Sequence, residues 1–363
     1  LTGKPLSINP SIGKILWMKE HEPALFARAR FLDVHAFLVQ RMSGRFRTSC
    51  GSADPMGLFD MRRQCWAGDL MQAIGLRPEQ FPEPVPPGAI LGEVTPEAAA
   101  ACGLPVGLPL VAGLGDGQAA ALGANITRPG RAYLNLGTAI VSGAYSETYV
   151  ADPAFRTLNG GIPTTYLLET VLLGGTYTVT WFVNHLAQID AAALGLQLAA
   201  EEVLEAAVRK IPAGAEGLLL VPYWNSVMNP YWDASASGIV VGWRGIHDRR
   251  HLYRAILEGI AFEQRLHTEG VEAATGERIE SYVAMGGGSR SALWCQIIAD
   301  ITGKPVYRSG SAEATALGAG ILAAAASGLY DDARAAASAM TRTEEAPFLP
   351  DPRQHALYSR LYE

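Results

Sequence analysis

One aspartate of this sequence stands between two glycines, and a glycine turn follows it further along the chain. Asp116 lies between Gly115 and Gly117, and about 20 residues later the chain reads Leu136-Gly137-Thr138. Glycine neighbours let a substrate hydroxyl approach the carboxylate closely, which a general base needs before its pKa matters. An aspartate in such a turn also often caps the following helix. The residues alone therefore leave both roles open for Asp116.

A second glycine-rich turn, Met285-Gly286-Gly287-Gly288-Ser289, follows an apolar segment and precedes a helical one. Turns that lead from a strand into a helix present backbone N–H groups and the positive end of the helix dipole to phosphate. One such turn is more often a simple tight turn, but its combination with Gly137-Thr138 favours a phosphate ligand. Proline follows the lysine in LTGKP and ITGKP, so neither is a Walker A loop, and no GxGxxG fingerprint occurs. A dinucleotide-dependent oxidoreductase is not expected.

Two further motifs carry weaker signals. The segment HDRRH (247–251) imitates the HExxH pattern of zinc hydrolases, but it has Asp in place of Glu and begins a predicted helix. We therefore expect a structural role for it rather than metal binding. The segment PYWNSVMNPYWD (222–233) repeats Pro-Tyr-Trp across a turn. Its rings would either stack on a sugar or pack together, and packing is slightly favoured.

Length and composition narrow the classes of protein. The 363 residues suit two domains, and 49% apolar with 18% charged residues is typical of an ordered globular protein. The net charge is −6 and no long basic run occurs, which argues against nucleic acid and anionic membranes as partners. No apolar run approaches the roughly 20 residues that a membrane helix needs. We expect a soluble protein without a nucleic-acid or membrane partner, and a homodimer is left open.

The four cysteines are far apart in the sequence and form no CxxC pair: Cys50, Cys65, Cys102 and Cys295. This spacing predicts four separate thiols rather than a disulfide framework or a zinc site. It is typical of a protein of the reducing cytoplasm, which is the expected location.

Hydrophobic periodicity predicts an α/β fold with two similarly built domains. The first residues predict two helices divided near Pro23, and the segment around Asp116 predicts a strand, a glycine turn and a helix. Residues 249–274 predict the longest helix, and residues 281–309 predict strand, turn, helix and strand. Polar residues at 143–161 predict a domain crossover with a hinge, and the boundary is expected near residue 145.

These segments resemble the FGGY carbohydrate kinase family, nearest in pattern to xylulokinases. KILWMKEHEP is similar to the family's Lys-x-x-Trp segment, and SGIVVGWRGIHDRRHLYRAILEGIAFE to its second signature. GGGSRSALWCQIIADITGKPV followed by ATALGAGILAAAASGLY is similar to its nucleotide region. The resemblance implies two actin-like, ribonuclease H-like ATPase domains around a cleft. Residues 1–145 would be the remainder of the N-terminal domain, without its first part, and residues 146–363 the C-terminal domain.

The resemblance also implies a reaction and the residues for it. The enzyme would use ATP and Mg²⁺ to phosphorylate a hydroxyl of a ketopentose such as xylulose. Ribulose, glycerol or another polyol is the alternative acceptor, and a non-catalytic nucleotide- or sugar-binding protein is the alternative class. Asp116 would be the catalytic base, would contact the metal indirectly and would bind substrate together with Gly117. The other implied residues hold ATP: Gly137 and Thr138 on phosphate, Gly175 near the nucleotide, and Gly286, Gly287 and Ser291 around the adenosine.

Overall fold

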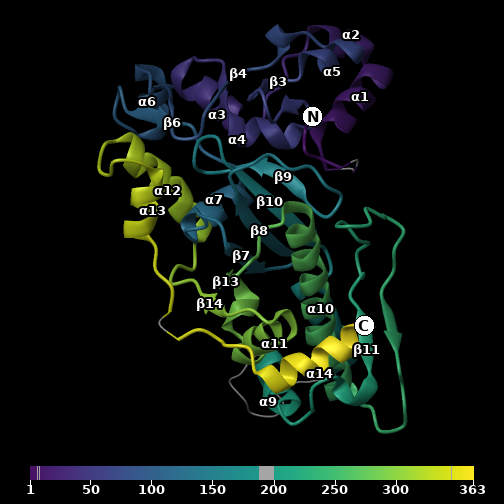
Figure 1. Ribbon diagram of the computed structural model, residues 1–363. Helices are drawn as coiled ribbons and strands as arrows, with labels where there is room; N and C mark the ends of the chain where they lie inside the picture. Colours follow the sequence, from purple (N-terminus) through teal and green to yellow (C-terminus); the bar gives the residue numbers. More distant parts are fainter. Residues whose placement is uncertain (6, 8, 188–199, 345) are drawn as a thin grey trace.

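The computed structural model describes residues 1–5, 7, 9–187, 200–344 and 346–363. In Figure 1 the N-terminal helices lie above a central sheet, and the C-terminal helix α14 lies below it. Within the described residues no helix combines the length and the apolar character that a membrane span requires. All four cysteines are free thiols, as the sequence predicts.

The region before the central sheet consists of short helices and three two-stranded sheets, β1-β4, β2-β3 and β5-β6. Pro23 is the first residue of α2, where its missing N–H costs no hydrogen bond, and the predicted break between two helices is confirmed. The helices are α1 (Ser11–His21), α2 (Pro23–Arg28), α3 (Val34–Ser43), α4 (Cys50–Ala53), α5 (Gly68–Ala73), α6 (Pro96–Cys102) and α7 (Asp116–Gly123). The strands are β1 (Arg47–Ser49), β2 (Phe59–Asp60), β3 (Cys65–Trp66), β4 (Glu83–Val85), β5 (Ile90–Glu93) and β6 (Pro109–Val111).

A six-stranded sheet forms the centre of the molecule, in the order β14-β13-β7-β8-β10-β9. The pairs β7-β8, β8-β10 and β10-β9 are antiparallel, whereas the pairs β13-β7 and β14-β13 are parallel. Three antiparallel strands, β7-β8-β10, with parallel strands added beside β7 form the ribonuclease H-like arrangement, and β9 is an additional antiparallel strand at the edge. The strands are β7 (Arg131–Leu136), β8 (Ile140–Ser146), β9 (Arg156–Asn159), β10 (Tyr166–Leu172), β13 (Ser281–Met285) and β14 (Val306–Arg308).

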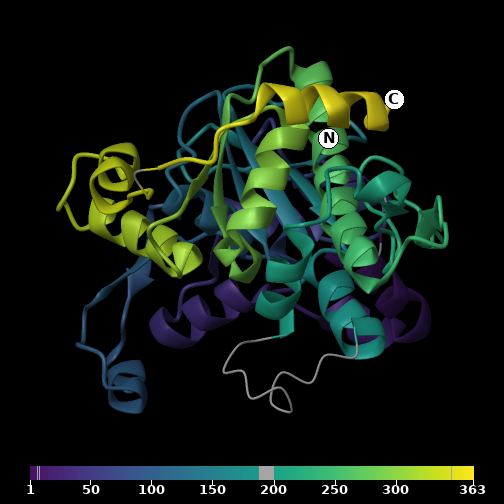
Figure 2. The same ribbon diagram turned by 90° about the horizontal axis from the view of Figure 1, so that it is seen from below.

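Helices cover both faces of this sheet, and side chains that alternate along β7 divide between them. Tyr133 belongs to the core shared with α7 and α12, whereas Ala132 and Leu134 belong to the core shared with α8, α10 and α11. Figures 1 and 2 show α12 and α13 on one side of the molecule and α10 on the other. The remaining elements are α8 (Thr176–Phe182), α9 (Ala200–Val208), α10 (Arg249–Thr275), α11 (Ala292–Thr302), α12 (Ala314–Ala326), α13 (Ala333–Met340), α14 (Pro352–Tyr362), β11 (Leu219–Val221) and β12 (Ile239–Val241).

Two glycines allow α7 and α12 to cross with their backbones in contact. A Cβ at Gly123 would lie 1.9 Å from the carbonyl oxygen of Ala314, and a Cβ at Gly318 would lie 1.9 Å from that of Ala119. Any larger residue would force the helices apart. Because Asp116 is the first residue of α7, this crossing fixes its position relative to the sheet.

Residues 143–161 are not a free crossover, contrary to the prediction. Residues 143–146 of β8 pair with 166–169 of β10, which pair in turn with 156–159 of β9. The segment therefore joins two strands of one sheet, and a hinge there would break the sheet ladder. The polar residues that suggested a linker instead form the turn between these strands.

The Pro-Tyr-Trp repeat packs against the sheet and α10. The Tyr223 hydroxyl donates to both carboxylate oxygens of Glu263, at 3.0 and 3.1 Å, and the Trp232 ring nitrogen donates to the Pro153 carbonyl at 2.7 Å. Burial raises the pKa of Glu263 to about 7, while the Tyr223 hydrogen bond opposes the shift. His267 lies 3.6 Å from this carboxylate, but burial lowers its pKa to about 4, so it is neutral near pH 7 and provides no countercharge.

Replacing Glu263 with glutamine is therefore expected to change how stability depends on pH. The pKa of Glu263 in the folded state is above its ordinary value of 4.5. Its contribution to the free energy of unfolding is therefore full below pH 4.5 and is lost as pH rises through about 7. From pH 5 to pH 8, wild type should lose about 2 to 3 kcal/mol of unfolding free energy relative to Glu263→Gln. Urea denaturation at both pH values measures the difference. An exposed control, Glu277→Gln, should lose as much unfolding free energy between the two pH values as wild type does. An equal loss in Glu263→Gln and wild type would show that the pKa of Glu263 is not raised.

Candidate functional site

Two glycine turns lie side by side at one edge of the central sheet. Strands β7 and β13 are parallel, with Asn135 opposite Met285, so the turns that follow them meet at the same edge. Gly286 has a φ of +81°, and a Cβ there would lie 2.4 Å from Oδ1 of Asn135. The left-handed backbone and the close approach both require glycine. We call this edge, with residues 137–138 and 286–291, the turn edge.

The N-terminus of α8 completes the turn edge. The backbone N–H groups of Thr176 and Tyr177 donate to the carbonyls of Gly137 and Thr138, at 3.0 and 3.1 Å. A Cβ at Gly175 would lie 2.7 Å from the backbone nitrogen of Ile140. The structure thus brings Gly175 beside Gly137 and Thr138, which lie well before it in the sequence.

A cavity of about 700 Å³ opens beside the turn edge, on the face covered by α8, α10 and α11. Gly287 and Ser291 line it, whereas Gly286 supports the turn from outside the lining. A Cβ at Gly287 would meet no atom within 4 Å, so a side chain there would enter open space. The Ser291 hydroxyl accepts from the Trp294 N–H at 3.0 Å and caps α11.

Sequence reasoning missed charged residues that hold this cavity in shape. Arg308, at the end of β14, donates to the carbonyls of Ser289 and Arg290, at 2.7 and 3.0 Å. In the opposite wall Glu205 pairs with Arg209 at 3.0 Å and accepts from the Leu293 N–H at 3.2 Å. These residues belong to no motif, and only the packing of β14 beside the turn and of α9 beside α11 reveals them.

Asp116 is exposed at the start of α7, on the other face of the sheet. Its Oδ1 accepts from the N–H of Gly117 at 2.8 Å, which leaves Oδ2 without a hydrogen bond among the described residues. The carboxylate thus satisfies one orphan N–H of the helix while staying accessible to solvent. The two roles left open by the sequence are compatible. Thr315 of α12 lies close by, its hydroxyl 3.5 Å from the Asp116 carbonyl.

The glycines beside Asp116 have a packing reason that the sequence did not reveal. A Cβ at Gly117 would lie 2.3 Å from Oε1 of Glu169, and a Cβ at Gly115 would lie 2.3 Å from Oε1 of Gln118. Glu169 is buried, and its carboxylate pairs with Arg156 and accepts from the Tyr133 hydroxyl at 3.2 Å. Burial, and then the charge of Glu169, raise the pKa of Tyr133 well above its usual value. Gly117 therefore lets α7 begin directly against a buried ion pair.

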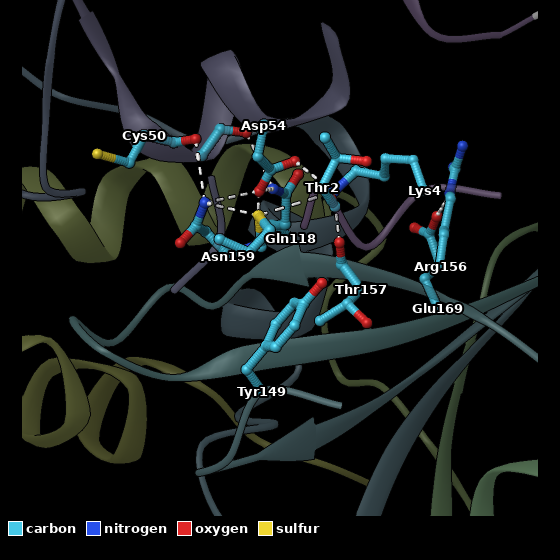
Figure 3. A network of polar contacts seen from close by, with 12 residues as sticks. Thr2, Lys4, Cys50, Asp54, Gln118, Tyr149, Arg156, Thr157, Asn159 and Glu169 are labelled. Carbon is cyan, nitrogen blue, oxygen red and sulfur yellow. Dashed lines mark hydrogen bonds and ion pairs between the residues drawn. The ribbon is translucent and has the colours of Figure 1, made fainter. Parts of the chain in front are cut away.

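A second buried polar network ties the first residues of the chain to α7 and β9 (Figure 3). The Lys4 ammonium lies 3.5 Å from Oδ1 of Asp54 and donates to the Thr157 carbonyl. Oδ2 of Asp54 accepts from the Asn159 backbone and side chain, at 2.5 and 2.8 Å, and from Gln118 at 3.4 Å. Burial lowers the pKa of Lys4 and raises that of Asp54, and the pairing between them offsets part of each shift.

This network was also missed. In the sequence Lys4 belongs only to the LTGKP segment, and no local pattern links it to partners that lie 50 or more positions away. The one available signal was Gln118, a polar residue immediately before the apolar run Ala119–Leu122. Such residues are costly to bury without partners.

Asp116 and the cavity thus lie on opposite faces of the sheet, with the turn after β7 at the edge between them. Within the described residues no hydrogen bond joins Asp116 to the turn edge. The described residues also contain no group of three or more His, Cys, Asp or Glu side chains placed to hold a metal ion. The HDRRH segment therefore does not form such a group. His251 instead contacts Asp248 and Glu216, at 3.0 and 3.1 Å, at the beginning of α10.

Comparison with known proteins gives two family matches that together span most of the chain. Residues 1–123 match the N-terminal domain, and residues 132–327 the C-terminal domain, of the FGGY family of carbohydrate kinases. The xylulose kinase of Bacillus subtilis is 32% identical over 97% of this chain and 69% of its own length. The autoinducer-2 kinase of Klebsiella pneumoniae is 29% identical over 99% of this chain and 68% of its own length. The xylulose kinase structure from Rhodospirillum rubrum superposes with a TM-score of 0.90 at 31% identity, over 99% of this chain and 72% of that one.

Proposed function

Since the chain belongs to the FGGY family of carbohydrate kinases, we propose that it transfers the γ-phosphoryl group of ATP to a hydroxyl of a small polyhydroxylated substrate. The observation that carries this proposal is the combination of a cavity, a glycine edge and an accessible carboxylate around one ribonuclease H-like sheet. Xylulose is the first candidate acceptor because xylulose kinases are among its relatives. Ribulose, glycerol and, from the other relatives, autoinducer-2 are the alternatives.

Asp116 is the proposed catalytic base. Its exposed carboxylate can accept the proton of the attacking hydroxyl, and the neighbouring Gly117 is the second proposed substrate contact. In phosphoryl transfer the protein contributes mainly positioning and charge stabilisation, so a rigid mount for this carboxylate matters as much as its basicity. The α7–α12 crossing and the ion pair of Glu169 behind Gly117 provide that mount.

The residues of the cavity fit ATP. The adenosine would enter the 700 Å³ cavity, where Gly287 and Ser291 leave room against the backbone, and the phosphates would extend to Gly137 and Thr138 at the turn edge. Because α8 begins at this edge, Gly175 would lie beside the phosphates. Backbone N–H groups of glycine turns are suited to phosphate oxygens.

Magnesium would arrive with the nucleotide. The described residues offer no cluster of three or more ligating side chains. Mg²⁺ bound to phosphates needs only one or two protein carboxylates and otherwise retains water. Asp116 is the proposed indirect contact, and the ion would supply charge neutralisation to the transferring phosphoryl group.

We also propose a domain division and a location. The N-terminal domain would end within residues 124–131, between the two family matches, rather than near residue 145, because β7 and β8 share one sheet with β13 and β14.

A cytoplasmic location is supported by the four free thiols.

An ADP-release assay across xylulose, ribulose, glycerol and autoinducer-2 tests the proposed function. We expect one acceptor to raise ADP release well above the rate with ATP and water alone. Nucleotide binding without turnover on any of these or on a wider panel of polyols would instead favour the non-catalytic binding protein.

A further inference from the structure

A second cavity lies at the edge of the sheet opposite the turn edge. Its volume is about 440 Å³, and its lining comprises Arg128, Pro129, Arg131, Glu280, Ser281 and Tyr307. Arg131 and Ser281 are register partners at the beginning of β7 and β13, whereas the glycine turns follow the ends of the same strands. This cavity, which we call the arginine pocket, is therefore separated from the candidate active site by the length of a strand, roughly 15–20 Å.

The two cations of the arginine pocket lack a protein partner. Among the described residues neither Arg128 nor Arg131 takes part in an ion pair or a side-chain hydrogen bond. Burial, and then the like charge of Arg128, lower the pKa of the half-buried Arg131. Glu280 does not compensate for them, because it is outside ion-pair distance of both arginines and its Oε2 lies against Gly130, 2.9 Å from where a Cβ would be. Arg128 is exposed, whereas Arg131 is half-buried with a like charge beside it and no carboxylate partner. Such an arrangement favours an external anion between the two guanidinium groups.

The other walls of the pocket supply hydroxyl groups. Tyr307 of β14 is the register partner of Val283, which lies two residues after Ser281 on β13. Because alternate residues of a strand share a face and Ser281 pairs with Arg131, all three side chains lie on the same side of the sheet. Neither hydroxyl has a hydrogen-bond partner within the described parts of the chain. The volume exceeds that of a bare phosphate and falls within the range of small-molecule sites.

We propose that the arginine pocket binds a phosphorylated small molecule, with Arg128 and Arg131 on the phosphate group and Ser281 and Tyr307 on the remainder. Paired guanidinium groups match the geometry of phosphate oxygens and hold them by charge-assisted hydrogen bonds. The site is distinct from the one that would hold ATP, so this inference does not depend on the proposed function.

The arginine pocket lies where a bound ligand would contact two parts of the chain. Arg128 belongs to the loop that joins α7 to β7, and this loop lies between the segments that match the N-terminal and C-terminal family domains. The loop is anchored on the sheet, since the Glu280 N–H donates to the Gly130 carbonyl at 2.7 Å, and Arg334 of α13 donates to the Thr127 carbonyl. A bound phosphate would therefore connect the segment that follows Asp116 and α7 to the C-terminal sheet.

Calorimetric titration with inorganic phosphate tests the site, using the full chain and the variants Arg128→Gln and Arg131→Gln. Arg353→Gln is the matched control, because Arg353 is an exposed arginine on α14, outside the pocket. We expect a binding event in wild type and in Arg353→Gln whose affinity falls at least about tenfold in each pocket variant. Titrations with a saturating, non-hydrolysable ATP analogue separate this event from phosphate bound at the turn edge, because the analogue also fills the γ-phosphate position.

Thermal melting without phosphate shows that the variants are folded. Because each pocket variant removes one of two like charges, its melting temperature in low salt should equal or exceed that of wild type. Added phosphate should then raise the melting temperature of wild type more than that of either pocket variant. The proposal is overturned if all four proteins bind phosphate equally, or if wild type has a Kd weaker than about 10 mM.

Discussion

Replacement of Asp116 by asparagine is expected to lower the turnover number by about two to four orders of magnitude, the usual contribution of a positioned general base. Asparagine retains an oxygen that can accept from the Gly117 N–H, and the side chain is exposed, so folding and ATP affinity should stay near wild type. Steady-state ADP release and a thermal melt measure the two effects separately.

The matched control for this change is Asp351→Asn. Asp351 also stands at a helix N-terminus, where it accepts from Arg353 and Gln354, but it caps α14, far along the chain from the turn edge. This control should turn over as wild type does. If Asp116→Asn kept most of its activity, Asp116 would not be the base, and the exposed carboxylate would have only its helix-capping role.

Replacement of Gly287 by valine is expected to weaken ATP binding at least about tenfold, or roughly 1.4 kcal/mol, and to leave sugar binding nearly unchanged. The backbone of Gly287 is outside the left-handed region and its Cβ would meet no atom within 4 Å, so the fold should accept the side chain. The added methyl groups would instead occupy the cavity beside Ser291, where the adenosine is proposed to lie.

Gly320→Val provides the control for this prediction. A Cβ at Gly320 would also meet open space, but the residue lies on α12, outside the cavity. Calorimetry with ATP and with the accepted sugar should detect the loss of affinity only for Gly287→Val and only with ATP. An equal loss of affinity for ATP and for sugar would contradict the position of Gly287 in the wall of an adenosine site.

The elements that the sequence predicted well are those defined by local patterns. The long helix α10 was recognised by its apolar periodicity, and the order strand, glycine turn, helix, strand over residues 281–309 was confirmed as β13, η5 (Gly287–Arg290), α11 and β14. In each case the side chains that determine the element lie within a few residues of one another.

Strand register and buried polar contacts could not be predicted in the same way. The sequence suggested a hinge between β8 and β9, but their pairing through β10 depends on residues that follow both strands. Likewise the partners Lys4, Asp54 and Asn159 meet only because three distant segments pack together. Of the candidate site, the glycine turns were visible as a pattern, whereas the ion pair behind Gly117 required the structure.

Single-turnover transfer from radiolabelled ATP tests most directly whether this chain is a kinase that uses Asp116. Enzyme in excess over ATP labelled at the γ position is mixed with the acceptor found by the ADP-release assay, and the labelled products are separated. We expect wild type to move the label to the acceptor and Asp116→Asn, with ATP still bound, to do so about two to four orders of magnitude more slowly. Equal transfer rates in the two proteins, or label released only as inorganic phosphate, would contradict this expectation.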